Sequence, residues 1–149
     1  MRPSAAADIA TIKRISAVPA ILQVITEMTG MRFAAVARVT QQTWTACAVL
    51  DNLGFGLEPG GELDLVSTLC FDSMNSFQPI IIDKASEDPV YQHHHTPKIY
   101  HFESYITIPV LRTDGSFFGT LCALDPNPAD LKNSAIQSTM ESFSRLLSL

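Results

Sequence analysis

Residues 102–125 contain two apolar runs that meet at an Asp-Gly pair, and this arrangement constrains the fold more than any other feature of the chain. The runs, 104–111 and 116–125, are rich in β-branched and aromatic side chains, which fit the pleated surface of a sheet. An Asp-Gly pair between two such runs is a strong short-range signal for a β-hairpin. We therefore expect an antiparallel hairpin with its turn over 112–115.

The residues before this hairpin predict two helices and a second hairpin. Apolar residues at helical spacing predict helices over 6–16 and 19–29, the second ended by Gly30. Two runs rich in Val, Thr and Ala, 32–39 and 43–50, predict a pair of antiparallel strands.

The middle of the chain is less regular. Four glycines and one proline mark residues 52–61 as a loop. Apolar residues near helical spacing predict a helix over 63–77, with Asp64 in its first turn, where an acid favours the helix dipole. A short strand over 79–82 precedes a polar segment, 83–102, with no clean period, and so long a connection is usually functional or mobile.

A last helix follows the hairpin. Its apolar stripe consists of Leu131, Ala135, Ile136, Met140, Phe143, Leu146 and Leu147. Antiparallel hairpins with helices at both ends of the chain predict an α+β fold.

Length, charge and cysteine spacing exclude several classes of protein. The 149 residues correspond to one domain. A net charge of −5 without a long basic run disfavours nucleic acid as a partner. No apolar stretch approaches the roughly 18 residues of a membrane span, and residues 1–7 lack the apolar core of a signal peptide. Cys47, Cys70 and Cys122 form no Cys-x-x-Cys pair, so we expect no disulfide framework, no structural zinc site and a cytoplasmic location.

The hairpin also resembles the signature of the GAF domain family. The residues that carry this resemblance are Ser-x-Ile-x-x-Pro-Val over 104–110 and Phe-Gly-x-Leu over 118–121, followed by Asp125. The resemblance implies a central antiparallel sheet with terminal helices on one face and a ligand pocket on the other, under the middle helix and the long loop. We expect a GAF domain over 19–149 and an N-terminal helix or linker over 1–18.

Side-chain alternation along 104–111 selects the residues that face this pocket. Ser104, Ile106, Ile108 and Val110 form the more uniformly apolar set, which we assign to the helix-covered core. Tyr105 and Thr107 of the other set then face the pocket, and Thr120, Cys122 and Leu124 could line it from the partner strand. Further candidates come from the first hairpin, the middle helix and the long loop. The candidate ligand-binding residues are Trp44, Cys70, Tyr91, His94, Tyr100, Phe102, Tyr105, Thr107, Thr120 and Cys122. Many aromatic and few charged side chains suit a flat or apolar ligand. The alternative is that these residues only fill a core.

Four histidines, at 93–95 and at His101, raise the possibility of a haem or metal ligand. Some GAF domains bind haem through a histidine of this loop, and others attach a tetrapyrrole to a Cys-His pair, whose place here is held by Gln92 and His93. Consecutive histidines rarely converge on one metal, so we assign no metal ligand and leave the cofactor unknown, with haem or a tetrapyrrole as an alternative.

Free methionine sulfoxide reductases, which are small GAF proteins with a thiolate nucleophile, provide an enzymatic alternative. Cys70 approximates one of their cysteine positions, but the loop cysteine is missing, and Tyr105, Cys122 and Leu124 stand where that family has acids. A reductase needs a nucleophile and a resolving thiol within reach of each other. We therefore expect no catalytic residue.

The resemblance thus implies a sensory or regulatory domain without catalytic activity of its own. We expect it to bind a small ligand, or to form a homodimer through its terminal helices, and to relay a signal to an attached effector. A histidine kinase of a two-component system and a cyclase are effectors of this kind.

Overall fold

The computed structural model describes residues 5–40, 43–64 and 77–147. Within these ranges six strands form one antiparallel sheet with the order β3-β2-β1-β6-β5-β4. The strands are β1 (Phe33–Val39), β2 (Thr43–Asp51), β3 (Glu62–Asp64), β4 (Ile80–Ile82), β5 (Ser104–Leu111) and β6 (Phe117–Asp125). The helices are α1 (Ala5–Arg14), α2 (Val18–Thr29), α4 (His95–Tyr100) and α5 (Ser134–Leu146), with a 3-10 turn, η2 (Ala85–Glu87). The predicted α+β class is confirmed.

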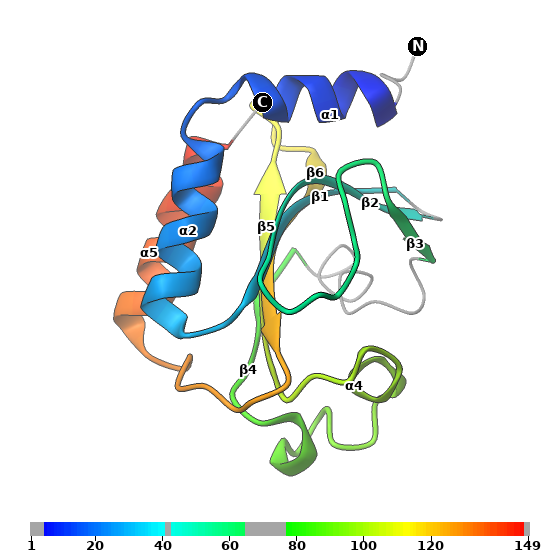
Figure 1. Ribbon diagram of the computed structural model, residues 1–149. Helices are drawn as coiled ribbons and strands as arrows, with labels where there is room; N and C mark the ends of the chain where they lie inside the picture. The colour runs from blue at the N-terminus through cyan, green and yellow to red at the C-terminus, as the bar shows by residue number, and fades with distance from the viewer. Residues whose placement is uncertain (1–4, 41–42, 65–76, 148–149) are drawn as a thin grey trace.

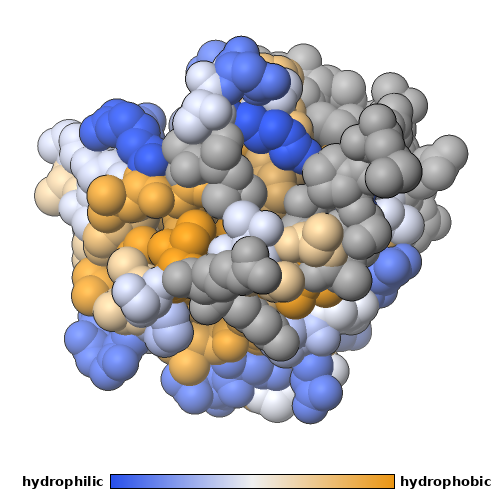
Figure 2. All heavy atoms as spheres, turned by 90° about the horizontal axis from the view of Figure 1, so that it is seen from above, coloured by the Kyte–Doolittle hydropathy of each residue, from blue (hydrophilic) through white to orange (hydrophobic). Residues whose placement is uncertain are grey.

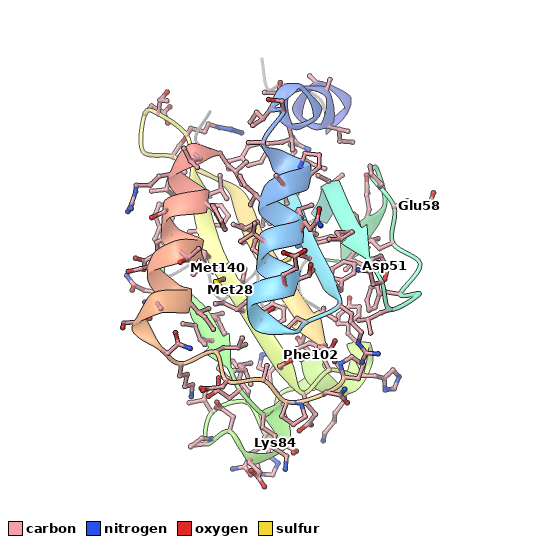
Figure 3. The ribbon with its side chains drawn as sticks, turned by 60° about the vertical axis from the view of Figure 1, so that its left-hand side comes forward. Met28, Asp51, Glu58, Lys84, Phe102 and Met140 are labelled. Carbon is pink, nitrogen blue, oxygen red and sulfur yellow. The ribbon has the colours of Figure 1, made fainter. Side chains whose placement is uncertain are left out.

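The helices and loops divide between the two faces of the sheet (Figure 1). The long helices α2 and α5 lie against one face, with α1 across their upper end, and α4 and the 52–61 loop lie on the opposite side. Each face carries its own apolar cluster. The helix-side cluster includes Met140 of α5, and Met28 of α2 packs against that cluster from the same side (Figure 3).

Local sequence signals account for the ends of the long helices. Pro19 lies in the first turn of α2, where its missing N–H leaves no hydrogen bond unmade. Gly30, with a φ of 75°, ends the helix as expected. Asn133 precedes α5 and accepts a hydrogen bond from the Ile136 N–H at 2.8 Å, which is a standard N-cap.

The predicted hairpin of β5 and β6 is confirmed, and so is the division of its side chains between the two faces. The strands pair from Ser104 opposite Asp125 to Val110 opposite Gly119. Ile106, Ile108 and Val110 belong to the helix-side cluster, and Tyr105 to the opposite one. Gly115 takes a φ of 87° in the turn, which favours glycine.

Two sequence-based expectations differ from the structure. Residues 62–64 form β3, with Asp64 opposite Thr43, so the helix expected from residue 63 does not begin there. The rest of that expected helix, 65–76, lies outside the described residues. The segment 83–102, expected to be irregular, contains η2 and α4. Elements of three to six residues are too short for side-chain periodicity to reveal them.

The predicted stripe of the last helix is only partly correct. The helix begins at Ser134, and Leu131 is fully buried just before it. Ile136 and Met140 face the sheet, whereas Leu146 is 66% exposed. The part of the stripe that does not contact the sheet is therefore available for another contact.

Candidate functional site

A small apolar cavity, here called the inner chamber, lies on the sheet face opposite α2 and α5. Its volume is about 30 Å³, which is enough for roughly one water molecule. The described residues that line the inner chamber are Phe33, Trp44, Phe55, Leu57, Leu63, Thr96, Tyr100, Phe102, Tyr105, Cys122 and Leu124. None of these side chains carries a charge at neutral pH.

Strand pairing brings the sheet part of this lining together. Leu124 of β6 lies opposite Phe33 of β1 on one side and opposite Tyr105 of β5 on the other. Trp44 of β2 lies opposite Leu63 of β3. Because cross-strand partners point to the same face, five strands contribute side chains to one floor.

The 52–61 loop and α4 form the cover of the inner chamber. Phe55 of the loop contacts Phe33 below it, with ring centroids 5.1 Å apart, and Tyr100 of α4 beside it, at 6.1 Å. Phe102 stacks on Tyr105 at 5.0 Å. Figure 3 shows Phe102 near the lower end of the sheet and Glu58 at the outer part of the loop. The floor and the cover are thus joined by aromatic contacts.

Asp51, the last residue of β2, fixes the first half of the loop. Its carboxylate accepts hydrogen bonds from the backbone N–H groups of Leu53 at 3.0 Å, Phe55 at 3.1 Å and Gly56 at 2.8 Å. Burial alone would raise the pKa of Asp51, but these hydrogen bonds stabilise the charged form and hold its pKa below the ordinary value. Asp51 therefore positions Phe55 over the inner chamber.

Five of the ten predicted ligand-binding residues line the inner chamber: Trp44, Tyr100, Phe102, Tyr105 and Cys122. Thr107 and Thr120 are fully buried on the same sheet face but lie outside the lining. Tyr91 and His94 pack on each other at 5.8 Å, also outside it. Cys70 lies outside the described residues.

The histidine segment has a local structural explanation. The half-buried His94 accepts a hydrogen bond at Nδ1 from the Thr96 N–H at 3.1 Å, where α4 begins. Among the residues that the structure describes, no group of three or more His, Cys, Asp or Glu could hold a metal ion.

The sequence reasoning missed five members of the lining: Phe33, Phe55, Leu57, Leu63 and Thr96. Residues 53–57 read Leu-Gly-Phe-Gly-Leu, an apolar residue at every second position of a glycine-rich loop. A loop exposed to solvent does not need this alternation, so the pattern could have predicted that Phe55 and Leu57 pack against the sheet. Phe33 lies on the strand next to β6, and only the register of the sheet places it beside Leu124.

The two described cysteines lie on opposite faces of the sheet. Cys122 lines the inner chamber, whereas Cys47 belongs to the helix-side cluster. A β-bulge opposite Val36 and Ala37 leaves Cys47 as the extra residue of β2. These two thiols therefore do not form a nucleophile and resolving pair.

A buried carboxylate, Asp125, lies next to the inner chamber, one residue after Leu124. It accepts two hydrogen bonds from the Arg32 guanidinium, at 2.9 and 3.0 Å, and one each from the backbone N–H groups of Arg32 at 3.0 Å and Asn127 at 2.8 Å. Burial raises the pKa of Asp125, but these donors outweigh burial and hold the pKa below its ordinary value. This contact, here called the Asp125 latch, joins the end of β6 to the turn between α2 and β1.

An antiparallel sheet with helices on one face and a covered apolar chamber on the other defines a class of α+β domain. The sequence profile of the GAF domain matches residues 14–149, and the chain belongs to this family. GAF domains are generally sensory or regulatory modules. No curated protein sequence matches this chain.

Solved structures agree with this fold. The type II free methionine-R-sulfoxide reductase from Thermoplasma acidophilum superposes with a TM-score of 0.68 at 16% identity, covering 93% of this chain and 92% of that one. The GAF domain of Acinetobacter phosphoenolpyruvate-protein phosphotransferase superposes with a TM-score of 0.67 at 15% identity, covering 99% of this chain and 92% of that one. The chromophore binding domain of Stigmatella aurantiaca phytochrome P1 superposes with a TM-score of 0.69 at 12% identity, covering 87% of this chain and 51% of that one. At these identities the likeness shows the fold alone.

The helices of the described ranges are all too short or too polar to cross a membrane.

Proposed function

We propose that this GAF domain senses a small, uncharged, flat or apolar molecule that binds in the inner chamber. The observation that carries the proposal is the chamber's lining, in which aromatic and aliphatic side chains from five strands and two covering segments converge. Such a site favours planar rings, because apolar surface leaves water and rings stack against Phe33, Tyr100 and Tyr105. A charged ligand would lose its hydration without gaining an ionic partner from the described lining.

The size of the chamber implies a conformational response. A cavity that binds benzene has a volume of about 150 Å³. The inner chamber, at about 30 Å³, is far smaller, so a ring fits only after the cover has moved. Binding would therefore select a state in which the Phe55 side chain or α4 is displaced. A ligand that prefers one of two states shifts the population between them, and this shift is the basis of sensing.

The polar contacts around α4 provide a route from this cover to α5. Asp83, just after β4, accepts hydrogen bonds from the N–H groups of Leu131 at 2.9 Å and Lys132 at 3.1 Å. The Lys132 ammonium lies 3.5 Å from the buried carboxylate of Asp88, which also accepts the N–H of Tyr91. The segment before α4 is thus tied to the segment that begins α5, and α5 would pass the change to an attached effector.

The terminal helices carry the second part of the proposal, a homodimer. Val24 of α2 is 41% exposed and Leu146 of α5 is 66% exposed. Figure 2 looks down on the end of the molecule that carries α1 and shows an apolar area bordered by hydrophilic surface. Pairing through α2 and α5 would bury the exposed side chains of Val24 and Leu146 and bring two effector domains together.

Trp44 makes the ligand part of the proposal testable. It is the single tryptophan of the chain, it is 3% exposed, and it lines the inner chamber. Nitrobenzene is planar, uncharged and quenches tryptophan fluorescence, and 4-nitrobenzoate has the same ring with a negative charge. We expect saturable quenching by nitrobenzene and much weaker quenching by 4-nitrobenzoate. Native mass spectrometry of the purified protein would show any ligand that is already bound.

A pair of β6 variants controls this experiment. Cys122→Leu places a larger side chain in the inner chamber and should abolish the saturable quenching. Thr120→Val changes a residue of the same strand and face that does not line the chamber, and should leave the quenching unchanged. If neither nitro compound gives saturable quenching and the native mass equals that of the bare chain, the proposed ligand site is wrong.

A further inference from the structure

A second hollow, here called the outer groove, adjoins the inner chamber. Its volume is about 410 Å³ and it is open to solvent. The described residues that line it are Leu53, Phe55, Tyr100, His101, Leu124 and Pro126. Phe55, Tyr100 and Leu124 also line the inner chamber. These three side chains therefore form the partition between the two spaces.

We propose that Phe55 and Tyr100 are a gate between the outer groove and the inner chamber, and that the two spaces become one ligand site when the gate opens. This inference rests on the proposed function, because it names the path by which the ligand enters and the shape of ligand that fits. The partition has one fixed member and two movable ones.

Leu124 is the fixed member. It lies within β6, which is paired on both sides, with Phe33 opposite it on β1 and Tyr105 opposite it on β5. Moving Leu124 would break hydrogen bonds to two neighbouring strands. The central position of β6 in the sheet therefore keeps this side of the partition in place.

Phe55 and Tyr100 lie outside the strands of the sheet. Phe55 lies between Gly54 and Gly56, whose φ angles of 73° and 91° are readily available to glycine. Tyr100 is the last residue of the six-residue α4, and the φ of 57° at His101 ends that helix sharply. Both rings pack from outside the sheet, so they can leave the partition without breaking strand pairing.

The hydrogen bonds of Asp51 limit this movement to the side chain of Phe55. The Asp51 carboxylate accepts hydrogen bonds from the N–H groups of Leu53, Phe55 and Gly56, which hold the backbone over 53–56 in place. Rotation of the Phe55 ring away from Phe33 and Tyr100 then connects the chamber with the groove. The outer groove is open to solvent and has room for the rotated ring.

The combined site selects a particular shape of ligand. A planar ring can take the place of the Phe55 ring beside Phe33, with its far edge in the inner chamber. The other end of the ligand then lies in the outer groove, whose lining includes the exposed imidazole of His101. We therefore assign to this site an arene with one polar substituent, inserted ring first.

Acrylamide quenching of Trp44 tests the gate without any ligand. Acrylamide is small and neutral, and it reaches a buried indole only when the protein opens locally. Phe55→Ala removes a partition ring and should raise the bimolecular quenching constant about threefold or more. Leu53→Ala is the matched control, because Leu53 lies in the same loop and lines only the outer groove. Equal quenching constants in the wild type and both variants would overturn the gate.

Stopped-flow mixing with nitrobenzene separates the gate from the proposed function. If nitrobenzene binds, Phe55→Ala should increase its association rate about fivefold or more, while Leu53→Ala leaves it unchanged. Binding with equal association rates would overturn the gate and leave the ligand site standing. Increased acrylamide quenching without nitrobenzene binding would support the gate and count against the proposed ligand class. If Phe55→Ala lacks the circular dichroism spectrum of the wild type, Phe55→Leu and Tyr100→Leu serve in the same comparison.

Discussion

The Asp125 latch gives the clearest quantitative prediction about the stability of this domain. Asp125→Ala removes the acceptor of four hydrogen bonds and leaves the backbone N–H groups of Arg32 and Asn127 without their partner. The Arg32 side chain is about half exposed, so water can replace its share of the contact. The predicted effect therefore depends on the two backbone groups.

The size of the effect follows from those two groups. A hydrogen bond to a charged acceptor contributes about 1–2 kcal/mol when it is partly buried, so the two together give about 2–4 kcal/mol. With a urea dependence of about 2 kcal/mol per M, the unfolding midpoint of Asp125→Ala should fall by about 1–2 M. Asp125→Asn keeps one acceptor oxygen and should lose about half as much.

Urea unfolding followed by circular dichroism measures these midpoints. The control is Asp114→Asn, because Asp114 is also a hydrogen-bonded aspartate but lies exposed at the hairpin tip, where it accepts from Ser116. We expect its midpoint to change far less than that of Asp125→Ala. An Asp125→Ala midpoint equal to that of the wild type would refute the role assigned to the Asp125 latch.

The dependence on pH provides a second check of the same contact. The folded-state pKa of Asp125 is lowered, so its contribution is fully present above the unfolded pKa of about 3.9 and is lost as the pH falls through the lower folded value. Asp51 also has a lowered pKa but is present in both proteins, and its effect cancels in the comparison. The stability difference between the wild type and Asp125→Asn should therefore shrink below about pH 4. A difference that grows on acidification would contradict this assignment.

Three further predictions concern packing, capping and association. Gly119→Ala would place a Cβ 1.8 Å from the Ala37 carbonyl oxygen. The substitution should therefore lower the melting temperature by about 5–10 °C or prevent folding. An unchanged melting temperature would contradict the close approach of β1 and β6. Asn133→Ala removes the N-cap of α5 and should lower the free energy of unfolding in urea by about 1 kcal/mol. Asn133→Asp keeps a capping oxygen and should retain most of that stability. If the terminal helices pair, Val24→Glu and Leu146→Glu should convert a dimer to a monomer in sedimentation velocity, and a wild type that is monomeric at high concentration would contradict the pairing.

The sequence predicted the elements whose signals are local. The β5–β6 hairpin depends on Asp114-Gly115 and on alternation within a few residues, and the end of α2 depends on Gly30 alone. The strand β3 and the helix α4 were not predicted, because neither is long enough to show a side-chain period. Their conformations depend on what they pack against, which alternation within one segment does not reveal.

The inner chamber was predictable only in part, for the same reason. Alternation placed Tyr105 and Cys122 on the correct face, because the period of a strand is fixed by its backbone. Phe33 enters the lining through the register of β1 against β6, and Phe55 through the turn that Asp51 holds. Register and loop conformation bring together residues far apart in sequence, and alternation within one segment does not reveal them.

The contacts around the chamber also indicate the direction in which a binding event would spread. The strand β6 is paired on both sides and ends in the Asp125 latch, so it is held more firmly than the segments that cover the inner chamber. One part of the cover, α4, follows a segment that Asp83 and Asp88 tie to the start of α5. A ligand that displaces Tyr100 would therefore act on α5 around the edge of the sheet, through 83–91 and 126–133, rather than through the sheet itself. Coupling of this kind needs only that the two positions of α4 favour different positions of α5, since the coupling free energy is the difference between those preferences.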